Sequence, residues 1–149
     1  MKKFIYAFAA LGVVIIDQVT KYYALVLCDH RCTINQYLSF DISFNRGISW
    51  GMLHSSNDTV FALVTMVITL CTLFLARFAL WRYKKGMLIL GEVLVVAGSF
   101  SNLIDRAWYH GVVDFIELSY RDWVWPLFNM ADCAIVLGVV IMVWEYGNE

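Results

Sequence analysis

Ionisable side chains interrupt the apolar stretches of this 149-residue chain, and each needs a chemical explanation. Asp17 and Lys21 are four residues apart, which places them on one face of a helix, where they can pair. A charged group within an apolar span costs roughly 3 kcal/mol, so it is a functional candidate by default. The pair is either a structural buried ion pair or part of the support of an active site.

A second polar group stands at the end of another apolar stretch. Asn102 precedes Asp105 by three residues and Arg106 by four, so it shares a helix face with both. The Arg106 guanidinium is suited to bind a carbonyl or a phosphate. The alternative is a charged helix end whose side chains extend to the membrane interface.

Two further aspartates lie in apolar surroundings. Asp114 lies in the apolar segment 111–115, and Asp132 lies about six residues inside the last apolar stretch. Because Pro126 suits the first turn of a helix, we expect Asn129 and Asp132 on one face of the outer part of that helix. Asp132 would then lie near the positive end of the helix dipole, either as a simple dipole partner or as a functional carboxylate.

The elements that must position these residues are membrane-spanning helices. The chain is 61% hydrophobic and 15% charged, with a mean hydropathy of +0.68, far from the average of soluble proteins. The first apolar stretch begins like a signal peptide but lacks a clear cleavage site, so we expect it to be retained. With one proline and no linker-like stretch, a single domain over residues 1–149 is predicted. The predicted spans, each close to the roughly 20 residues that cross hydrocarbon, are 4–27, 59–81, 87–104 and 124–144.

The distribution of Lys and Arg predicts the orientation of these spans. Cations cluster before the first span and around the second connection, which predicts that both termini and this connection are cytoplasmic. The polar groups described above, together with Asn45, then converge on the outer half of the molecule, which scattered structural residues would not do. Glu92, on the inner half, is interpreted as a snorkelling or packing residue. The cations that mark the inner side are Lys2, Lys3, Arg77, Arg82, Lys84 and Lys85.

A small sheet is predicted outside the membrane. Residues 38–45 alternate between apolar and polar side chains, which is typical of a half-buried strand. Gly47 and Gly51, just beyond it, permit a turn close to another backbone. The predicted fold class is an all-α membrane protein with four transmembrane helices and a small β-sheet and loop cap on the outer side. A net charge of -1 with dispersed cations argues against nucleic acid as a partner.

Five ordered segments, 17–21, 45–51, 102–106, 111–115 and 128–132, resemble the signature of the lipoprotein signal peptidases. They read Asp-Gln-Val-Thr-Lys, Asn-Arg-Gly-Ile-Ser-Trp-Gly, Asn-Leu-Ile-Asp-Arg, Gly-Val-Val-Asp-Phe and Phe-Asn-Met-Ala-Asp. The match covers nearly the whole chain. The family pattern G-G-A-x-G before Asn102 is replaced by Ala97, Gly98, Ser99, Phe100 and Ser101, and Trp50 stands where phenylalanine is usual. The added Cβ atoms are expected to affect helix packing and the substrate preference near Ser101.

The resemblance implies a bacterial inner-membrane aspartic endopeptidase that cleaves prolipoproteins just before the diacylglyceryl-modified cysteine. Asp114 and Asp132 match the catalytic pair of the family, and the implied active site is at the periplasmic face. The implied partners are the lipidated prolipoprotein and membrane lipids, and we expect a monomer without metal or cofactor. The residues expected to bind substrate or support the site are Asp17, Lys21, Asn45, Gly47, Asn102, Asp105, Arg106 and Asn129.

Paired carboxylates have a chemistry that suits peptide hydrolysis. Two that are held close together do not both ionise readily, so the pair can keep one proton and act as base and acid around one water. We hypothesise that Asp114 and Asp132 activate this water for attack on the scissile carbonyl and then protonate the leaving amine. The sequence leaves open which of the two is the base.

Other functions are less well supported by the sequence. Cys28, His30 and Cys32 are three candidate metal ligands within five residues, but they lack the usual second pair of ligands, so a disulfide or free thiols are expected there. A small transporter or channel, with a polar path through Asp17, Lys21, Asp105 and Asp132, is the main alternative function. An inactive homologue that binds lipopeptides is disfavoured because both aspartates are present.

Overall fold

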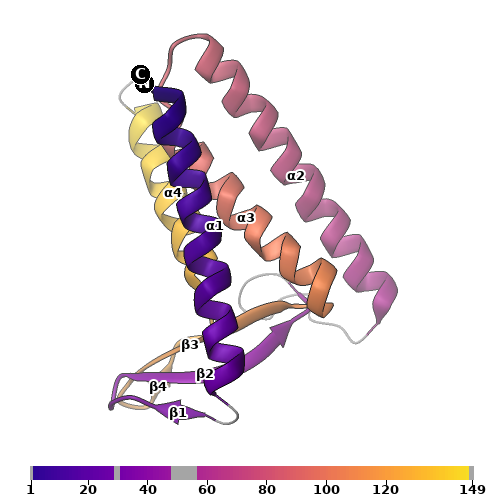
Figure 1. Ribbon diagram of the computed structural model, residues 1–149, viewed down its shortest axis with the longest axis vertical. Helices are drawn as coiled ribbons and strands as arrows, with labels where there is room; N and C mark the ends of the chain where they lie inside the picture. Colours follow the sequence, from indigo (N-terminus) through magenta and orange to yellow (C-terminus); the bar gives the residue numbers. More distant parts are fainter. Residues whose placement is uncertain (1, 29–30, 48–56, 148–149) are drawn as a thin grey trace.

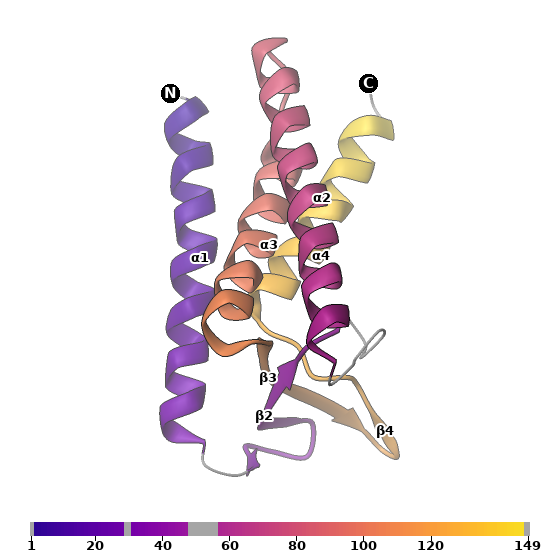
Figure 2. The same ribbon diagram turned by 90° about the vertical axis from the view of Figure 1, so that its right-hand side faces the viewer.

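The computed structural model describes residues 2–28, 31–47 and 57–147. Its helices are α1 (Lys2–Leu27), α2 (Asp58–Lys84), α3 (Leu90–Tyr109) and α4 (Met130–Gly147). They form one bundle, and α3 packs against α1, α2 and α4 (Figure 1). The start of α1 and the end of α4 lie at the same end of the bundle, and the sheet lies at the other (Figure 2).

Three helices have the length and composition of membrane spans. Within the described residues these are α1, α2 and α4, in agreement with the predicted spans 4–27 and 59–81 and most of 124–144. The remaining predicted span, 87–104, corresponds to α3, whose 20 residues include the charged Glu92, Asp105 and Arg106. The structure supports a mostly helical membrane protein in which three helices could cross hydrocarbon on these criteria.

The distribution of side chains is the reverse of that in a soluble protein. Phe8, Phe74 and Trp144 are 73%, 75% and 75% exposed on the outside of the bundle. The fully buried side chains include Asp17, Lys21 and Glu92 instead. Such an arrangement suits hydrocarbon as the surrounding solvent, because apolar groups gain nothing by leaving it while charged groups must find partners.

Glu92 is a packing residue, and the snorkelling interpretation is wrong. Its side chain is 0% exposed and pairs with Arg82 of α2. The Tyr146 hydroxyl of α4 donates a hydrogen bond to Glu92 Oε1 at 2.9 Å. Arg82 also lies over the Tyr146 ring, 4.3 Å from its centroid. This cluster joins α2, α3 and α4 near the end of the bundle that carries the termini.

Glycines bring the backbones of α3 and α4 into close contact. A Cβ atom on Gly98 would lie 2.6 Å from the Ala131 carbonyl oxygen, and one on Gly138 would lie 2.6 Å from that of Gly91. Either is closer than van der Waals contact allows, so a side chain there would force the helices apart. The close approach is kept although Ala97 and Ser101 carry Cβ atoms where the resembled family has glycine.

The strands are β1 (Cys32–Thr33), β2 (Leu38–Asn45), β3 (Val112–Tyr120) and β4 (Trp123–Val124). They form an antiparallel sheet in the order β1-β2-β3-β4, so the predicted strand over residues 38–45 is confirmed. A register shift between Phe40 and Ser43 places Ser43 opposite Asp114 and Asn45 opposite Val112. Gly51 and Trp50, to which the sequence also drew attention, lie outside the described residues.

The predicted start of the last span is wrong. Residues 125–129 are not helical: Trp125 N donates a hydrogen bond to Leu118 O at 2.7 Å, and Phe128 forms an isolated bridge with Ile116 of β3. The Phe128 carbonyl accepts hydrogen bonds from Phe115 N and Ile116 N at 3.1 and 2.9 Å, and Phe128 N donates to Ile116 O at 3.2 Å. Pairing with β3 overrides the local preference of Pro126 for a helix start, and α4 begins at Met130. This pairing brings the first turn of α4 next to Asp114.

Candidate active site

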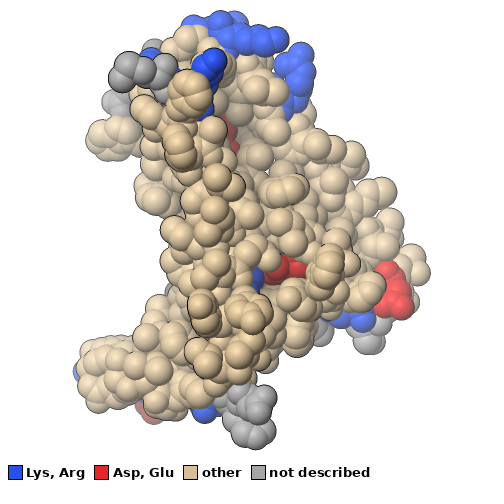
Figure 3. Space-filling model, in the orientation of Figure 1, with Lys and Arg blue, Asp and Glu red and all other residues tan. Residues whose placement is uncertain are grey.

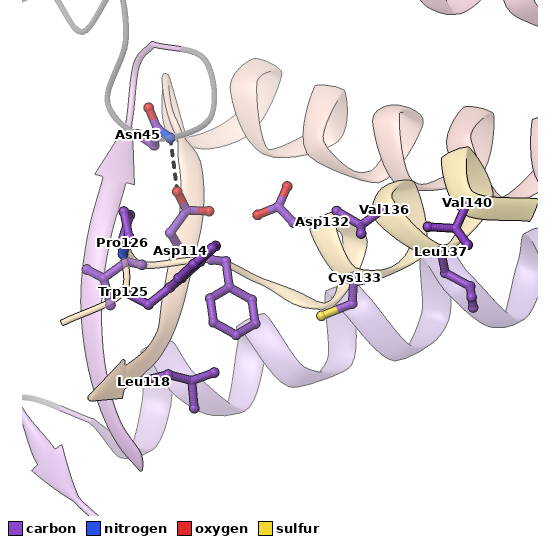
Figure 4. Close-up of a pocket in the computed structure, with 12 residues that line it drawn as sticks. Asn45, Asp114, Leu118, Trp125, Pro126, Asp132, Cys133, Val136, Leu137 and Val140 are labelled. Atoms are coloured by element: carbon purple, nitrogen blue, oxygen red, sulfur yellow. Dashed lines mark hydrogen bonds between the residues drawn. The ribbon is translucent and has the colours of Figure 1, made fainter. Parts of the chain in front are cut away.

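Asp114 and Asp132 face each other at the junction of β3 and α4, with their carboxylates turned toward one another (Figure 4). Asp114 lies on β3 and its side chain is only 4% exposed. Asp132 lies in the first turn of α4, so the prediction that it occupies the positive end of this helix is confirmed. The pairing of residue 128 with β3 is what brings together two carboxylates 18 residues apart in sequence.

Asn129 caps α4 and also binds Asp114. Asp132 N donates to Asn129 Oδ1 at 2.9 Å, and Asn129 N donates to Asp132 Oδ2 at 3.1 Å. This reciprocal arrangement is a capping box, in which two backbone N–H groups that the helix leaves without partners are satisfied. Asn129 Nδ2 then donates to Asp114 Oδ1 at 2.7 Å, so one residue fixes the positions of both carboxylates.

Amide side chains complete the set of donors. Asn45 Nδ2 donates to Asp114 Oδ2 at 3.0 Å, and Asn102 Nδ2 donates to Asp132 Oδ1 at 3.0 Å. Each of the four carboxylate oxygens of the pair therefore accepts one hydrogen bond from a neutral N–H group. The predicted approach of Asn45, Asn102 and Asn129 to the two aspartates is thus present in the structure.

The environment of Asp114 favours its protonated form. Burial, and then the nearby negative charge of Asp132, raise the pKa of Asp114 to about 7, against the weaker opposing effect of the hydrogen bonds from Asn45 and Asn129. A carboxyl group of this pKa is about half protonated at pH 7, whereas an ordinary aspartate is almost fully ionised there. The site therefore provides a carboxylic acid beside a second carboxyl group, as acid–base catalysis requires.

Lys21 links the first helix to this pair. Its Nζ lies 2.6 Å from Asp17 Oδ2 and 2.6 Å from Asp105 Oδ2, so the predicted Asp17–Lys21 pair is formed and gains a second carboxylate. Lys21 Nζ also donates to Asn102 Oδ1 at 2.8 Å. This bond fixes the orientation of the Asn102 amide, because the carbonyl oxygen must face Lys21 and the NH₂ group must then face Asp132.

Asp17 and Asp105 anchor the backbone around the site. Asp17 Oδ1 accepts a hydrogen bond from Ala131 N at 2.8 Å, which holds the first turn of α4 against α1. Asp105 Oδ2 accepts from Val113 N at 3.2 Å, immediately before Asp114 on β3. The two carboxylates that pair with Lys21 therefore each position the segment that carries one of the facing aspartates.

Gln18 was not singled out from the sequence, and Ser101 was named there only as a departure from the family pattern. Ser101 Oγ donates to Asp17 Oδ2 at 2.6 Å, and Gln18 Nε2 donates to Asp105 Oδ1 at 2.9 Å and to Ser101 Oγ at 3.1 Å. The signal available in the sequence was that Gln18 is a polar residue inside an apolar span. Ser101 faces α1, whereas Ser99 lines a cavity beside the two aspartates.

Arg106 binds carbonyl groups, one of the two roles considered for it. It donates to the carbonyl oxygens of Gly47 and Arg46, the latter at 3.4 Å, and to Thr65 Oγ1 at 3.4 Å, and it lies over the Phe61 ring, 5.5 Å from its centroid. The guanidinium thus holds the segment that follows β2 against α3. Gly47 is buried in this contact, so both residues support the site from the side of Asn45.

Two cavities meet at the facing aspartates. The larger, of about 510 Å³, extends along the apolar side of α4 past Val136, Leu137 and Val140. The smaller, of about 160 Å³, lies between α2, α3 and α4 and reaches Asn102 and Arg106. Asn45, Asp114 and Asp132 line both cavities, so a substrate could approach the pair with an apolar group on one side and a polar group on the other.

The cysteines near the sheet lie away from this site. Cys28 and Cys32 are free thiols that line a different cavity, of about 420 Å³, between the end of α1 and the sheet. His30, the third member of the metal site considered from the sequence, lies outside the described residues.

Comparisons with known proteins point in one direction. The sequence profile of the family described as "Signal peptidase (SPase) II" matches residues 9–147. The chain is 34% identical to the lipoprotein signal peptidase of Rickettsia bellii over 143 residues, which cover 91% of this chain and 71% of that protein. It is 32% identical to that of Dichelobacter nodosus over 128 residues, covering 85% and 83% of the two proteins. A solved bacterial membrane enzyme is also similar in fold, with a TM-score of 0.75 and 26% identity over 93% of this chain and 84% of that one.

Proposed function

Because the chain belongs to the signal peptidase II family of membrane aspartic peptidases, we propose that Asp114 and Asp132 are its catalytic pair. The proposed reaction removes the signal peptide of a diacylglyceryl-modified prolipoprotein, just before the lipidated cysteine. The observation that carries this assignment is the pair of facing carboxylates, whose oxygens all accept hydrogen bonds, at the meeting point of two cavities.

The geometry supports a division of work between the two carboxyl groups. The ionised member takes a proton from a water held between them as the water attacks the scissile carbonyl carbon. The protonated member polarises the carbonyl oxygen, and a proton then passes to the nitrogen of the leaving peptide as the C–N bond breaks. The donors that orient the two carboxyl groups are the neutral amides of Asn45, Asn102 and Asn129. Because these amides carry no positive charge, they do not neutralise the pair, which can still hold one proton.

The larger cavity suggests how the lipidated substrate is placed. Leu137 and Val140 form an apolar wall that extends from Asp132 along α4. We propose that this wall binds the apolar part of the substrate next to the scissile bond. Arg106, which binds backbone carbonyl groups, supports the smaller cavity on the other side of the catalytic pair. The hydrocarbon of a diacylglyceryl group would gain roughly 25 cal/mol for each Å² it removes from water.

Cleavage of a synthetic lipopeptide by the purified, reconstituted protein tests this function. The expected result is a cut before the cysteine in the diacylglyceryl form, and little or no cut in the same peptide without the lipid. A transporter or an inactive lipopeptide-binding homologue would release no product. Family membership favours the peptidase over both alternatives.

The raised pKa of Asp114 predicts how the rate depends on pH. Below about pH 7 Asp114 keeps its proton and the pair can hold one acid and one base. Above that pH both groups ionise, the acid is lost, and kcat/KM should fall by about tenfold per pH unit. The measurement is a pH–rate profile with the lipopeptide between pH 5 and 9. A rate that keeps rising up to pH 9 would contradict this assignment.

Stability should change with pH in the same direction. The folded-state pKa of Asp114 is raised above the ordinary value of a carboxyl group, so the folded protein binds this proton more tightly than the unfolded chain. The resulting stabilisation is fully present below about pH 4 and is lost as the pH rises through about 7. Asp114→Asn removes this contribution, so that part of the pH dependence of thermal stability should be absent in the variant.

We also propose that all four helices cross the membrane, with the sheet and catalytic pair on the periplasmic side. A helix of 20 residues, such as α3, is about 30 Å long, which is enough to span hydrocarbon. An odd number of crossings would place the two ends of the chain on opposite sides, yet the start of α1 and the end of α4 lie at one end of the bundle. The excess of cations at that end supports its assignment to the cytoplasm.

Reporter fusions test this orientation. Alkaline phosphatase fused after Lys85, between α2 and α3, is expected to be inactive because it remains in the cytoplasm. The same enzyme fused after Arg121, between β3 and β4, should be exported and active. The reverse pattern would overturn the orientation, and activity at both positions would show that α3 does not cross.

We propose that one chain forms the complete site as a single-domain monomer. The donors and carboxylates described above come from α1, α3, α4, β2 and β3 of the same chain. The test is light scattering of the purified protein. After the mass of the detergent is subtracted, the mass of the protein should be that of one chain, 17.1 kDa.

A further inference from the structure

A second apolar groove lies away from the catalytic pair, on the side of α3 that faces α1 and α2. Its volume is about 600 Å³. Among the described residues, none that lines this groove also lines either of the two cavities beside Asp114. Most of its lining is apolar, although Thr72 and Glu92, which is paired with Arg82, also line it. The apolar side chains come from three helices and include Leu11, Val14, Leu73, Ala76, Val93 and Val96.

The groove has a narrow end and an open side. At the end that carries the termini, the rings of Tyr6 on α1 and Tyr83 on α2 meet edge to face, with centroids 6.1 Å apart. Toward the sheet the two helices diverge (Figures 1 and 2). Leu11 and Leu73 are 55% and 60% exposed, so the groove opens to the hydrocarbon of the surrounding bilayer.

Lysine residues lie beyond the narrow end of the groove, next to the termini. Lys2 precedes Tyr6 by four residues, and Lys84 follows Leu80 by four. Such spacings place each lysine on the same helix face as a residue that lines the groove, one turn nearer the termini. The space-filling view shows the Lys and Arg side chains gathered at this end of the molecule (Figure 3).

We propose that this groove is a binding site for an anionic phospholipid of the cytoplasmic leaflet. The phosphate is held by Lys2 and Lys84, and one acyl chain lies along the groove. Basic pockets between transmembrane helices on the cytoplasmic side are known to bind anionic headgroups. The acyl chain of a phospholipid without net charge would fit the apolar walls equally well. The lysines are therefore what makes the site selective for an anionic headgroup.

An acyl chain fits the groove better than a peptide segment does. A helix has a diameter of roughly 10–12 Å with its side chains. Near Tyr6 and Tyr83 the helices α1 and α2 are close enough for their rings to touch, so no helix can pass between them. A hydrocarbon chain can lie along the outside of this ring pair and continue into the wider part of the groove.

Photo-crosslinking tests the site. The full chain is reconstituted in phosphatidylcholine vesicles that contain a trace of phosphatidylglycerol with a diazirine on one acyl chain, and the labelled peptides are mapped by mass spectrometry. Peptides of α1, α2 and α3 that line the groove should be labelled several-fold more than the lipid-facing side of α4 around Val143, which is 67% exposed. Unlabelled phosphatidylglycerol should compete, whereas the same diazirine on phosphatidylcholine should label both surfaces alike.

Two matched pairs of variants separate this site from ordinary lipid contact. Lys84→Gln should reduce labelling of the groove roughly fivefold, the usual effect of one basic residue near an anionic headgroup, while Lys85→Gln, whose ammonium lies over the Trp81 ring, should not. Ala10→Trp fills the groove and should block labelling, whereas Phe8→Trp, on a different face of α1 where the side chain is 73% exposed, should leave it intact.

Several results would overturn the proposal. Equal labelling of the groove by the two lipids would mean that only ordinary surrounding lipid covers it. Equal effects of Lys84→Gln and Lys85→Gln would mean that net charge alone attracts the anionic lipid. Displacement of the label by a lipoprotein signal peptide, or crosslinks between two copies of the chain, would assign the groove to a different occupant.

Discussion

Asp114→Asn and Asp132→Asn are each expected to lower kcat for lipopeptide cleavage by about 10²–10⁴-fold. This is the range that general acid–base catalysis contributes. Either change removes an ionisable group from the pair, so that the water loses its base or the leaving nitrogen loses its acid. Because the two groups act as one unit, the double variant should be no slower than the slower single variant. The measurement is single-turnover cleavage at saturating lipopeptide.

The structure distinguishes this loss from a loss of folding. Both oxygens of Asp114 accept hydrogen bonds from amide groups, and an asparagine there can accept only one of the two. The same holds for Asp132, which accepts from Asn102 Nδ2 and Asn129 N. Each variant should therefore be destabilised by about 1–3 kcal/mol, yet remain folded and bind the lipopeptide.

Glu117→Gln is the matched control for the change at Asp114. Glu117 lies three residues further along β3 and pairs with Arg31, away from the two cavities. This change removes one carboxylate from the same strand and should leave kcat nearly unchanged. Robust turnover by either aspartate variant, or a wild-type rate that a chelator abolishes and zinc restores, would contradict the proposed pair.

Local spacing was sufficient to predict some of the site. The four-residue separation of Asp17 and Lys21 fixes their proximity within one helix, and the structure contains that pair. The alternation of residues 38–45 predicted β2 for the same reason, because a period of two is a property of the strand itself. In both cases the prediction depends only on residues that are close together in the sequence.

Contacts between distant segments could not be predicted in this way. The hydrogen bond from Ala131 N to Asp17 joins residues 114 apart, and the pairing of Lys21 with Asp105 depends on how α1 packs on α3. The start of α4 was misplaced because the preference of Pro126 for a helix is weaker than the hydrogen bonds that Trp125 and Phe128 form with β3. The signature motifs indicated which residues belong to the site, but not which atoms they bind.

Lys21→Met is expected to have the largest effect on stability. The ammonium of Lys21 is buried and lies between Asp17 and Asp105, 2.6 Å from an oxygen of each, so its removal leaves two buried carboxylates without their cation. Breaking a buried ion pair on one side costs roughly 3–5 kcal/mol, which is a large part of the 5–15 kcal/mol by which typical domains are stable. Lys3→Met, on the exposed part of the same helix, should cost almost nothing in detergent.

A double variant shows whether the uncompensated charge is the cause. Lys21→Met alone raises the net negative charge of the Asp17–Lys21–Asp105 cluster, and adding Asp105→Asn returns it to its original value. Lys21→Met/Asp105→Asn should therefore unfold at a higher temperature than Lys21→Met, although it contains one more substitution. It should still cleave slowly, because Asn102 has lost the donor that holds its amide toward Asp132. Strict additivity of the two losses would mean that Lys21 acts through packing, and that its charge does not hold the catalytic helices together.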